Sequence, residues 1–159
     1  VTELKNSQEI IEQLERDNLF LLPLDDGRQW YRYHHLFSEF LLRSFERRNP
    51  GGVADLHRRA YQWFAEQNMI PEAVGHAIAA SDWNRSSDFI ESCRHDMIKM
   101  GRVLTLYGWI GQLPPEILAG RPLVQLAYSW ALSLMRRYEG ARTMYDAARV
   151  KIVAVSSPV

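Results

Sequence analysis

Hydrophobic and polar positions change their period twice in the first part of the chain. Near the start of the chain, apolar residues from Ile10 to Leu14 fall on one helical face and the glutamates between and beside them point outward. This spacing predicts a helix that Asn6 or Ser7 can cap. Residues 19–24 are a short apolar run that contains Pro23 near its end, which predicts a strand near a sheet edge.

A turn and a second strand are predicted next. Residues 25–28 have hairpin-turn chemistry, because glycine accepts positive φ and aspartate bonds its own backbone. Residues 29–33 return as an aromatic strand, and from Leu36 the apolar spacing becomes helical. Helix, β-hairpin and helix describe the later part of a winged-helix domain, which we assign to residues 1–49.

The clearest break in the pattern is the segment Asn49–Gly52, which marks a predicted domain boundary. Residues 53–159 then show helical spacing almost throughout. The predicted helices cover residues 53–64, 71–80, 82–99, 104–113, 122–136 and 139–150. The fold class is therefore mainly α, with a partial winged-helix unit and one β-hairpin before a helical region.

Small side chains recur at one spacing in three of these helices. In each set a large residue is followed by positions three, seven and ten residues later. The sets are Ile70-Ala73-Ala77-Ala80, Trp83-Ser86-Ile90-Cys93 and Tyr138-Ala141-Tyr145-Ala148. Because small residues let two helices approach closely, the pattern predicts a divergent tetratricopeptide-like α-solenoid, which we expect to be truncated.

The tryptophans and the single cysteine are predicted to lie in the core. Trp63, Trp83, Trp109 and Trp130 fall within helical patterns, and truncating Trp63 to alanine should cost ~3–5 kcal/mol. Cys93 excludes an intramolecular disulfide and a cysteine-based zinc cluster, and its apolar neighbours predict a small buried hydrophobe.

Charge and hydropathy bear on the compartment and partners. Lysine plus arginine and aspartate plus glutamate both total 19, so the chain lacks a net field that would hold it on nucleic acid or an anionic membrane. No apolar run approaches the ~20 residues of a membrane span. The unpaired cysteine fits a reducing cytoplasm. The start of the chain resembles neither a signal peptide nor an initiation site, so we expect a piece of a longer protein.

Six stretches resemble a known family, the large ATP-dependent LuxR-family activators of the maltose-regulator (MalT-like) type. They are Phe20–Asp26, Trp30–Phe37, Leu56–Ala60, Glu72–Ala77, Leu113–Pro114 and Arg121–Leu123. In that family a signal-transduction ATPase precedes a winged-helix domain, a helical-repeat sensor and a C-terminal helix-turn-helix. The resemblance implies that this chain holds the winged-helix region and the beginning of the sensor.

The resemblance also implies which partners and cofactors belong elsewhere. The sequence contains no G-x-x-x-x-G-K-[ST] motif and no recognisable DNA-reading helix pair, so we expect neither enzymatic activity nor a cofactor in this chain. The parent protein would hold ATP or ADP. The implied partners are the missing ATPase domain, a small-molecule or protein effector, and DNA through a missing C-terminal domain, with no membrane.

His34 is the candidate site residue. Tyr33–Leu36 aligns with the Met-His-Asp motif of related signal ATPases, with His34 on the histidine and His35 in place of the aspartate. The resemblance implies that His34 contacts the diphosphate of ADP, and imidazole N–H groups can bond a phosphate. His35 takes a supporting role. On its residue type alone, His34 could instead cap the adjoining helix or pair with a carboxylate.

Other candidates point to ordinary structural roles. His35 and Glu39 are four residues apart, which favours a helical ion pair over a metal site. His57, His76 and His95 recur every 19 residues on three predicted helices, which we interpret as coincidence. The possible basic patch is interpreted as a solvated face or a contact with the missing ATPase domain, rather than a DNA site. Its members are Arg43, Arg47, Arg48, Arg58 and Arg59.

The sequence therefore predicts a regulatory and sensor segment of an ATP-dependent transcriptional activator. It predicts no catalytic residue and no metal ligand, and it leaves the effector-binding residues open. The alternatives are a helical-repeat interaction scaffold without a nucleotide link and a DNA-binding winged helix.

Overall fold

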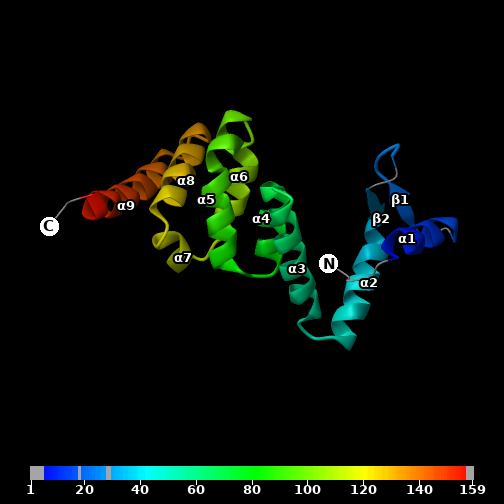
Figure 1. Cartoon of the computed structure of the whole chain (residues 1–159). Helices are drawn as coiled ribbons and strands as arrows, with labels where there is room; N and C mark the ends of the chain where they lie inside the picture. Colours follow the sequence, from blue (N-terminus) through cyan, green and yellow to red (C-terminus); the bar gives the residue numbers. More distant parts are fainter. Residues whose placement is uncertain (1–5, 18, 28–29, 157–159) are drawn as a thin grey trace. The chain divides into compact units, whose positions relative to one another are not determined.

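The computed structural model of the chain describes residues 6–17, 19–27 and 30–156. The chain divides into two compact units, Val1–Leu56 and His57–Val159. The described residues form helices and one two-stranded sheet joined by turns and loops (Figure 1), so the predicted mainly α class with a winged-helix unit and helical repeats is confirmed. None of the helices in the described part is long and apolar enough to cross a bilayer.

The first unit has the predicted order of helix, β-hairpin and helix. Its elements are α1 (Ser7–Arg16), β1 (Leu21–Pro23), β2 (Tyr31–Tyr33) and α2 (His35–Arg48). The strands are antiparallel, with Leu21 opposite Tyr33 and Pro23 opposite Tyr31. A proline is tolerated here because each strand has only one neighbour. The predicted turn residue Arg28 and strand residue Gln29 lie outside the described residues.

The helices that follow begin where the punctuating residues predicted. They are α3 (Gly52–Glu66), α4 (Ile70–Ala79), α5 (Trp83–Lys99), α6 (Val103–Ile110), α7 (Pro115–Ala119), α8 (Pro122–Leu134) and α9 (Tyr138–Ser156). Pro71 stands in the first turn of α4, and Asp82 caps α5 by accepting a 3.2 Å hydrogen bond from the Arg85 N–H. Helix α9 runs to Ser156, beyond the predicted end near Val150.

Gly101 ends α5 by a conformation that favours glycine. Its φ is +71°, the left-handed region, where a Cβ is disfavoured. The turn lets the N–H of Arg102 donate to the Met97 carbonyl at 2.8 Å and the N–H of Gly101 donate to the Ile98 carbonyl at 3.0 Å. The last carbonyls of the helix are thereby satisfied, as in a Schellman motif.

Two helical hairpins, α4 with α5 and α8 with α9, dominate the packing of the second unit, and α6 contacts both α5 and α8. The small residues predicted at close helix contacts are buried there, among them Ala73, Ala77, Ala141 and Ala148. The Ser129 hydroxyl also donates a 2.7 Å hydrogen bond to the Ala141 carbonyl, which joins α8 to α9. The predicted close approach of paired helices is therefore confirmed.

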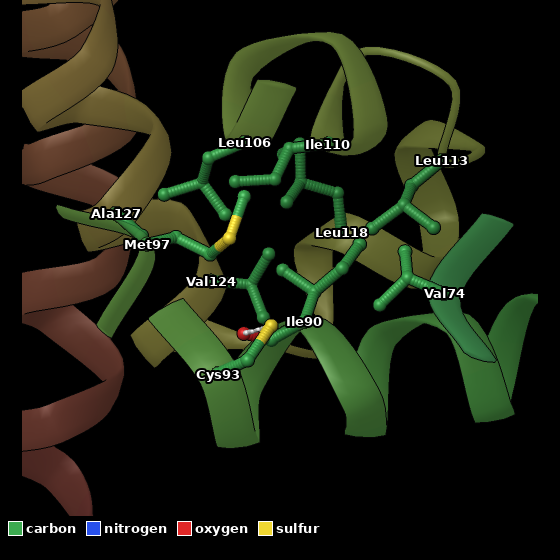
Figure 2. Packing of buried hydrophobic residues seen from close by; sticks show 10 residues of the cluster. All are labelled: Val74, Ile90, Cys93, Met97, Leu106, Ile110, Leu113, Leu118, Val124 and Ala127. Atoms are coloured by element: carbon green, nitrogen blue, oxygen red, sulfur yellow. Dashed lines mark hydrogen bonds between the residues drawn. The ribbon is translucent and has the colours of Figure 1, made fainter. Parts of the chain in front are cut away.

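The main core lies where α5, α6 and α8 meet. Figure 2 shows side chains from these helices and from α4 converging on one cluster. Its members are Val74, Ile90, Cys93, Met97, Leu106, Ile110, Leu113, Leu118, Val124 and Ala127. Cys93 is 7% exposed, so the prediction of a buried small hydrophobe is confirmed.

The core assignment was wrong for two tryptophans. Trp63 and Trp130 are each 40% exposed, whereas Trp83 and Trp109 are partly buried against the main cluster. On α3 the buried side chains are Ala60 and Tyr61, and Phe64 packs against the cluster that contains Tyr61. The Trp63 ring instead lies edge-on to Phe64, with ring centroids 5.1 Å apart.

Candidate functional site

His34 lies at the junction between β2 and α2. Its N–H donates to the Phe20 carbonyl at 2.8 Å, and its own carbonyl accepts from the Ser38 N–H at 3.0 Å. The residue occupies the N-cap position with φ −54° and ψ 137°, but its side chain makes no capping hydrogen bond. The backbone is thus held from the strand side and from the helix side, while the imidazole is exposed.

The imidazole of His34 borders an apolar hollow of about 350 Å³. Phe20, Leu36, Phe37 and Phe40 provide the remaining walls. Three of these apolar side chains are unusually exposed, at 60% for Phe20, 64% for Leu36 and 59% for Phe40. An exposed cluster of large apolar side chains is typical of a surface that contacts another protein surface.

Phe20 adopts a strained backbone conformation at this hollow. Its φ is +57°, which is rare for an aromatic residue. Its carbonyl accepts the hydrogen bond from His34, and its ring packs on Phe37 with centroids 5.3 Å apart. Strain of this kind costs ~1–3 kcal/mol and often marks functional sites. Nothing in the sequence pattern around Phe20 predicts it.

His35 is the first residue of α2 and is also exposed. Its ring lies beside that of His34, with centroids 4.4 Å apart and planes inclined at 34°. Glu39 forms its ion pair with Arg43, at 3.8 Å, rather than with His35 as predicted. Arg43 lies on the solvent side one turn further along α2, where two long flexible side chains meet with little desolvation.

The members of the suggested basic patch fall into both units. Arg43 is held by Glu39, and Arg48 donates a 2.9 Å hydrogen bond to the Ser44 hydroxyl. Arg43 and Arg47 also border a shallow surface with Phe40 and Glu46. Arg58 and Arg59 belong to the second unit. The arginines of α2 therefore have neighbours of mixed charge and polarity on their own helix.

Two histidines that the sequence interpretation dismissed are in contact. The Nδ1 atoms of His57 and His76 lie 2.8 Å apart, and the ring centroids 5.0 Å apart. His95 is exposed on α5. The interpretation of the 19-residue spacing as coincidence was therefore wrong for the first two, because packing of α3 on α4 joins them.

The described residues were also considered as possible metal ligands. In the part of the chain that the structure describes, no three or more histidine, cysteine, aspartate or glutamate side chains gather as a metal site would require. The chemistry available at the junction of β2 and α2 is that of exposed imidazole donors beside an apolar surface. Such an arrangement can hydrogen-bond an anionic group presented by a neighbouring protein surface.

Comparison with known protein families finds a match in the N-terminal part of the chain. Residues 1–53 match the family described as the MalT winged helix domain. Over 134 residues the chain is 37% identical to serine/threonine-protein kinase PknK from two strains of Mycobacterium tuberculosis and from Mycobacterium bovis. The match covers 84% of this chain and spans only 12% of the length of those relatives. No solved structure matches the chain. The N-terminal part of the chain is a MalT-like winged-helix region.

Proposed function

We propose that the chain is a regulatory and sensor segment of a MalT-like, ATP-dependent transcriptional activator of the LuxR family. The winged-helix region relays the nucleotide state of an ATPase domain elsewhere in the parent protein. The helical repeats bind a small-molecule or protein effector. The segment itself is not an enzyme, ATP or ADP is held by the parent, and DNA is bound through another domain.

The observation that carries the proposal is the presentation of His34. A MalT-like winged helix supplies the context, and two backbone hydrogen bonds hold this residue while its ring stays exposed. An imidazole held in this way can donate to the diphosphate of ADP without first ordering its own backbone. His35 takes the supporting role, because its ring lies beside that of His34 with centroids 4.4 Å apart.

The apolar hollow next to His34 favours a protein surface as the carrier of the nucleotide. Phe20, Leu36 and Phe40 expose most of their side chains, which is costly unless another surface covers them. We assign this face to contact with the ATPase domain of the parent. The imidazole would then lie at the edge of a desolvated contact, where a hydrogen bond to phosphate is stronger than in water.

The regulatory step is a shift between two states of the parent. In the resting state His34 holds ADP, and effector binding to the helical repeats favours a state in which this contact is broken. Near-complete switching requires about a 10⁴-fold preference of the effector for the active state. The helical repeats must therefore contact the effector very differently in the two states.

The test is His34→Ala in the full-length parent. Loss of a charge-assisted hydrogen bond should weaken ADP binding by roughly 10- to 100-fold and raise transcription in the absence of effector. His95→Ala, which removes an exposed histidine from α5, is the matched control and should change neither quantity. Unchanged ADP affinity and unchanged basal transcription in His34→Ala would overturn the proposal.

The relatives support a second candidate parent. Serine/threonine-protein kinase PknK is 37% identical over 84% of this chain, which is 12% of the kinase, so the segment could serve as the regulatory part of a kinase. Assays of phosphotransfer and of ATP-dependent transcription with the intact parent distinguish a kinase from a transcriptional activator. Phosphorylation of serine or threonine substrates without promoter activation would favour the kinase.

A further inference from the structure

His57 on α3 and His76 on α4 are joined by a hydrogen bond between their Nδ1 atoms. Only one of these two nitrogen atoms can carry a proton while the bond exists. Their Nδ1 atoms are 2.8 Å apart, so one ring must donate and the other must accept through a lone pair. The two side chains are half-buried. The His76 ring also stacks on Phe64, with planes inclined at 13° and centroids 5.2 Å apart, which restricts its rotation.

Charged side chains lie near the pair on α3, α4 and α5. On α3, Arg58 brings positive charge close to Tyr61, one turn from His57, and Arg85 does so from α5. The carboxylate of Asp82 already accepts hydrogen bonds from the Tyr61 hydroxyl and the Arg85 N–H.

On α4 itself, Glu72 lies one turn before His76 with an exposed side chain. Burial lowers the pKa of both histidines, and the charge of His57 lowers the pKa of His76 further. Both effects favour the state with at most one shared proton.

We propose that His57 and His76 form a proton-sensitive latch between α3 and α4. With one shared proton the hydrogen bond holds the two helices together, and with both rings protonated two donors face each other and the latch opens. Helix α3 runs without interruption across the boundary between the two compact units. Acidification would therefore loosen the helical repeats from the helix that connects them to the winged-helix unit.

The sign of the pH dependence follows from the neutral state of the pair. A histidine whose pKa is lower in the folded chain binds fewer protons there than in the unfolded chain, so its contribution weakens on acidification. The latch is intact above the ordinary histidine value of 6.5, and it is lost at lower pH as the second ring takes up its proton. This property is independent of whether the parent binds nucleotide.

The first measurement is an NMR titration of the histidine side chains in the unmodified chain with EDTA present. We expect the His57 and His76 rings to titrate together in two steps separated by about one pH unit or more, both below 6.5. Independent titration of the two rings at the ordinary histidine value would overturn the latch. This measurement needs no variant and so does not depend on a substitution that disturbs folding.

The second measurement is amide hydrogen exchange along residues 57–66, corrected for the intrinsic effect of pH. In the unmodified chain, protection of this segment should fall as the pH drops below 6.5, and His95→Gln should behave in the same way. His57→Gln and His76→Gln should each abolish the dependence on pH. Protection that does not vary with pH in the unmodified chain, or that varies equally in all the variants, would contradict the proposal.

Discussion

The phenolic hydroxyl of Tyr61 donates a 2.8 Å hydrogen bond to Oδ2 of Asp82. The bond joins the middle of α3 to the residue that caps α5, and Oδ1 of the same carboxylate accepts from the Arg85 N–H. The Asp82 side chain therefore caps the start of α5 and also anchors α3. The tyrosine is 5% exposed, and the hydrogen bond is partly buried.

Tyr61→Phe should lower the free energy of unfolding by about 1–3 kcal/mol, because the bond is made to a charged carboxylate. Urea denaturation followed by circular dichroism measures this change. Tyr138→Phe removes a hydroxyl from a residue that is 65% exposed and should leave stability unchanged. A double-mutant cycle with Asp82→Ala should show coupling between the two positions. Additive effects in that cycle would contradict the bond.

The same pair predicts a loss of stability at alkaline pH. Burial, with a smaller contribution from Asp82, raises the pKa of Tyr61 above its ordinary value of 10.0. A raised pKa means that the folded chain retains the proton more strongly, so this contribution is complete below pH 10.0 and declines above it. Denaturation of the unmodified chain and of Tyr61→Phe across this range should show a steeper decline for the former.

Truncating a buried side chain and truncating a partly exposed one should lower the free energy of unfolding by different amounts. Ile90 is fully buried in the main core, so Ile90→Ala should cost about 2–5 kcal/mol. Trp63 is 40% exposed and contacts Phe64 edge-on, so Trp63→Ala should cost only about 1–2 kcal/mol, less than its sequence context predicts. Thermal unfolding of both variants compares the two costs. A larger loss for Trp63→Ala would contradict the orientation of α3.

Prolines and helix-capping residues made the starts of several helices predictable from the sequence. Pro71, Asp82 and Pro122 act locally, through a fixed φ or a short side-chain hydrogen bond, and each marks the start of a helix within one residue. The face that a helix buries depends instead on what lies opposite. Trp63 shows this, because Ala60 and Tyr61 occupy the close-packed positions of α3.

The candidate site was predictable in position but not in geometry. The change of period near His34 correctly marks a junction between strand and helix, since alternation and helical spacing are visible in one chain segment. The left-handed Phe20 and the contact between His57 and His76 depend on tertiary packing. No single-sequence pattern encodes which faces of α3 and α4 meet.

The buried side-chain amide oxygen of Gln125 on α8 suggests a substitution that raises stability. Gln125 is 4% exposed, and its Oε1 has no hydrogen-bond partner among the described residues. A desolvated acceptor without a partner costs about 1–3 kcal/mol, so Gln125→Met, which keeps the length of the side chain, should stabilise the chain. Gln62→Met on the exposed side of α3 is the control. A lower melting temperature for Gln125→Met would show that an unseen partner satisfies the oxygen.

Cys93 should be nearly inert in the folded chain. Desolvation raises the pKa of its thiol to about 11, and the side chain lies in the main core at 7% exposure. Because the thiolate is the reactive form, Ellman's reagent at mildly alkaline pH should react far more slowly with the folded chain than with the chain in denaturant. The residual rate reports opening of the α5–α6–α8 core, so Ile90→Ala should accelerate labelling, whereas His95→Gln on the exposed side of α5 should not. Rapid labelling of the unmodified folded chain would show that this core admits solvent.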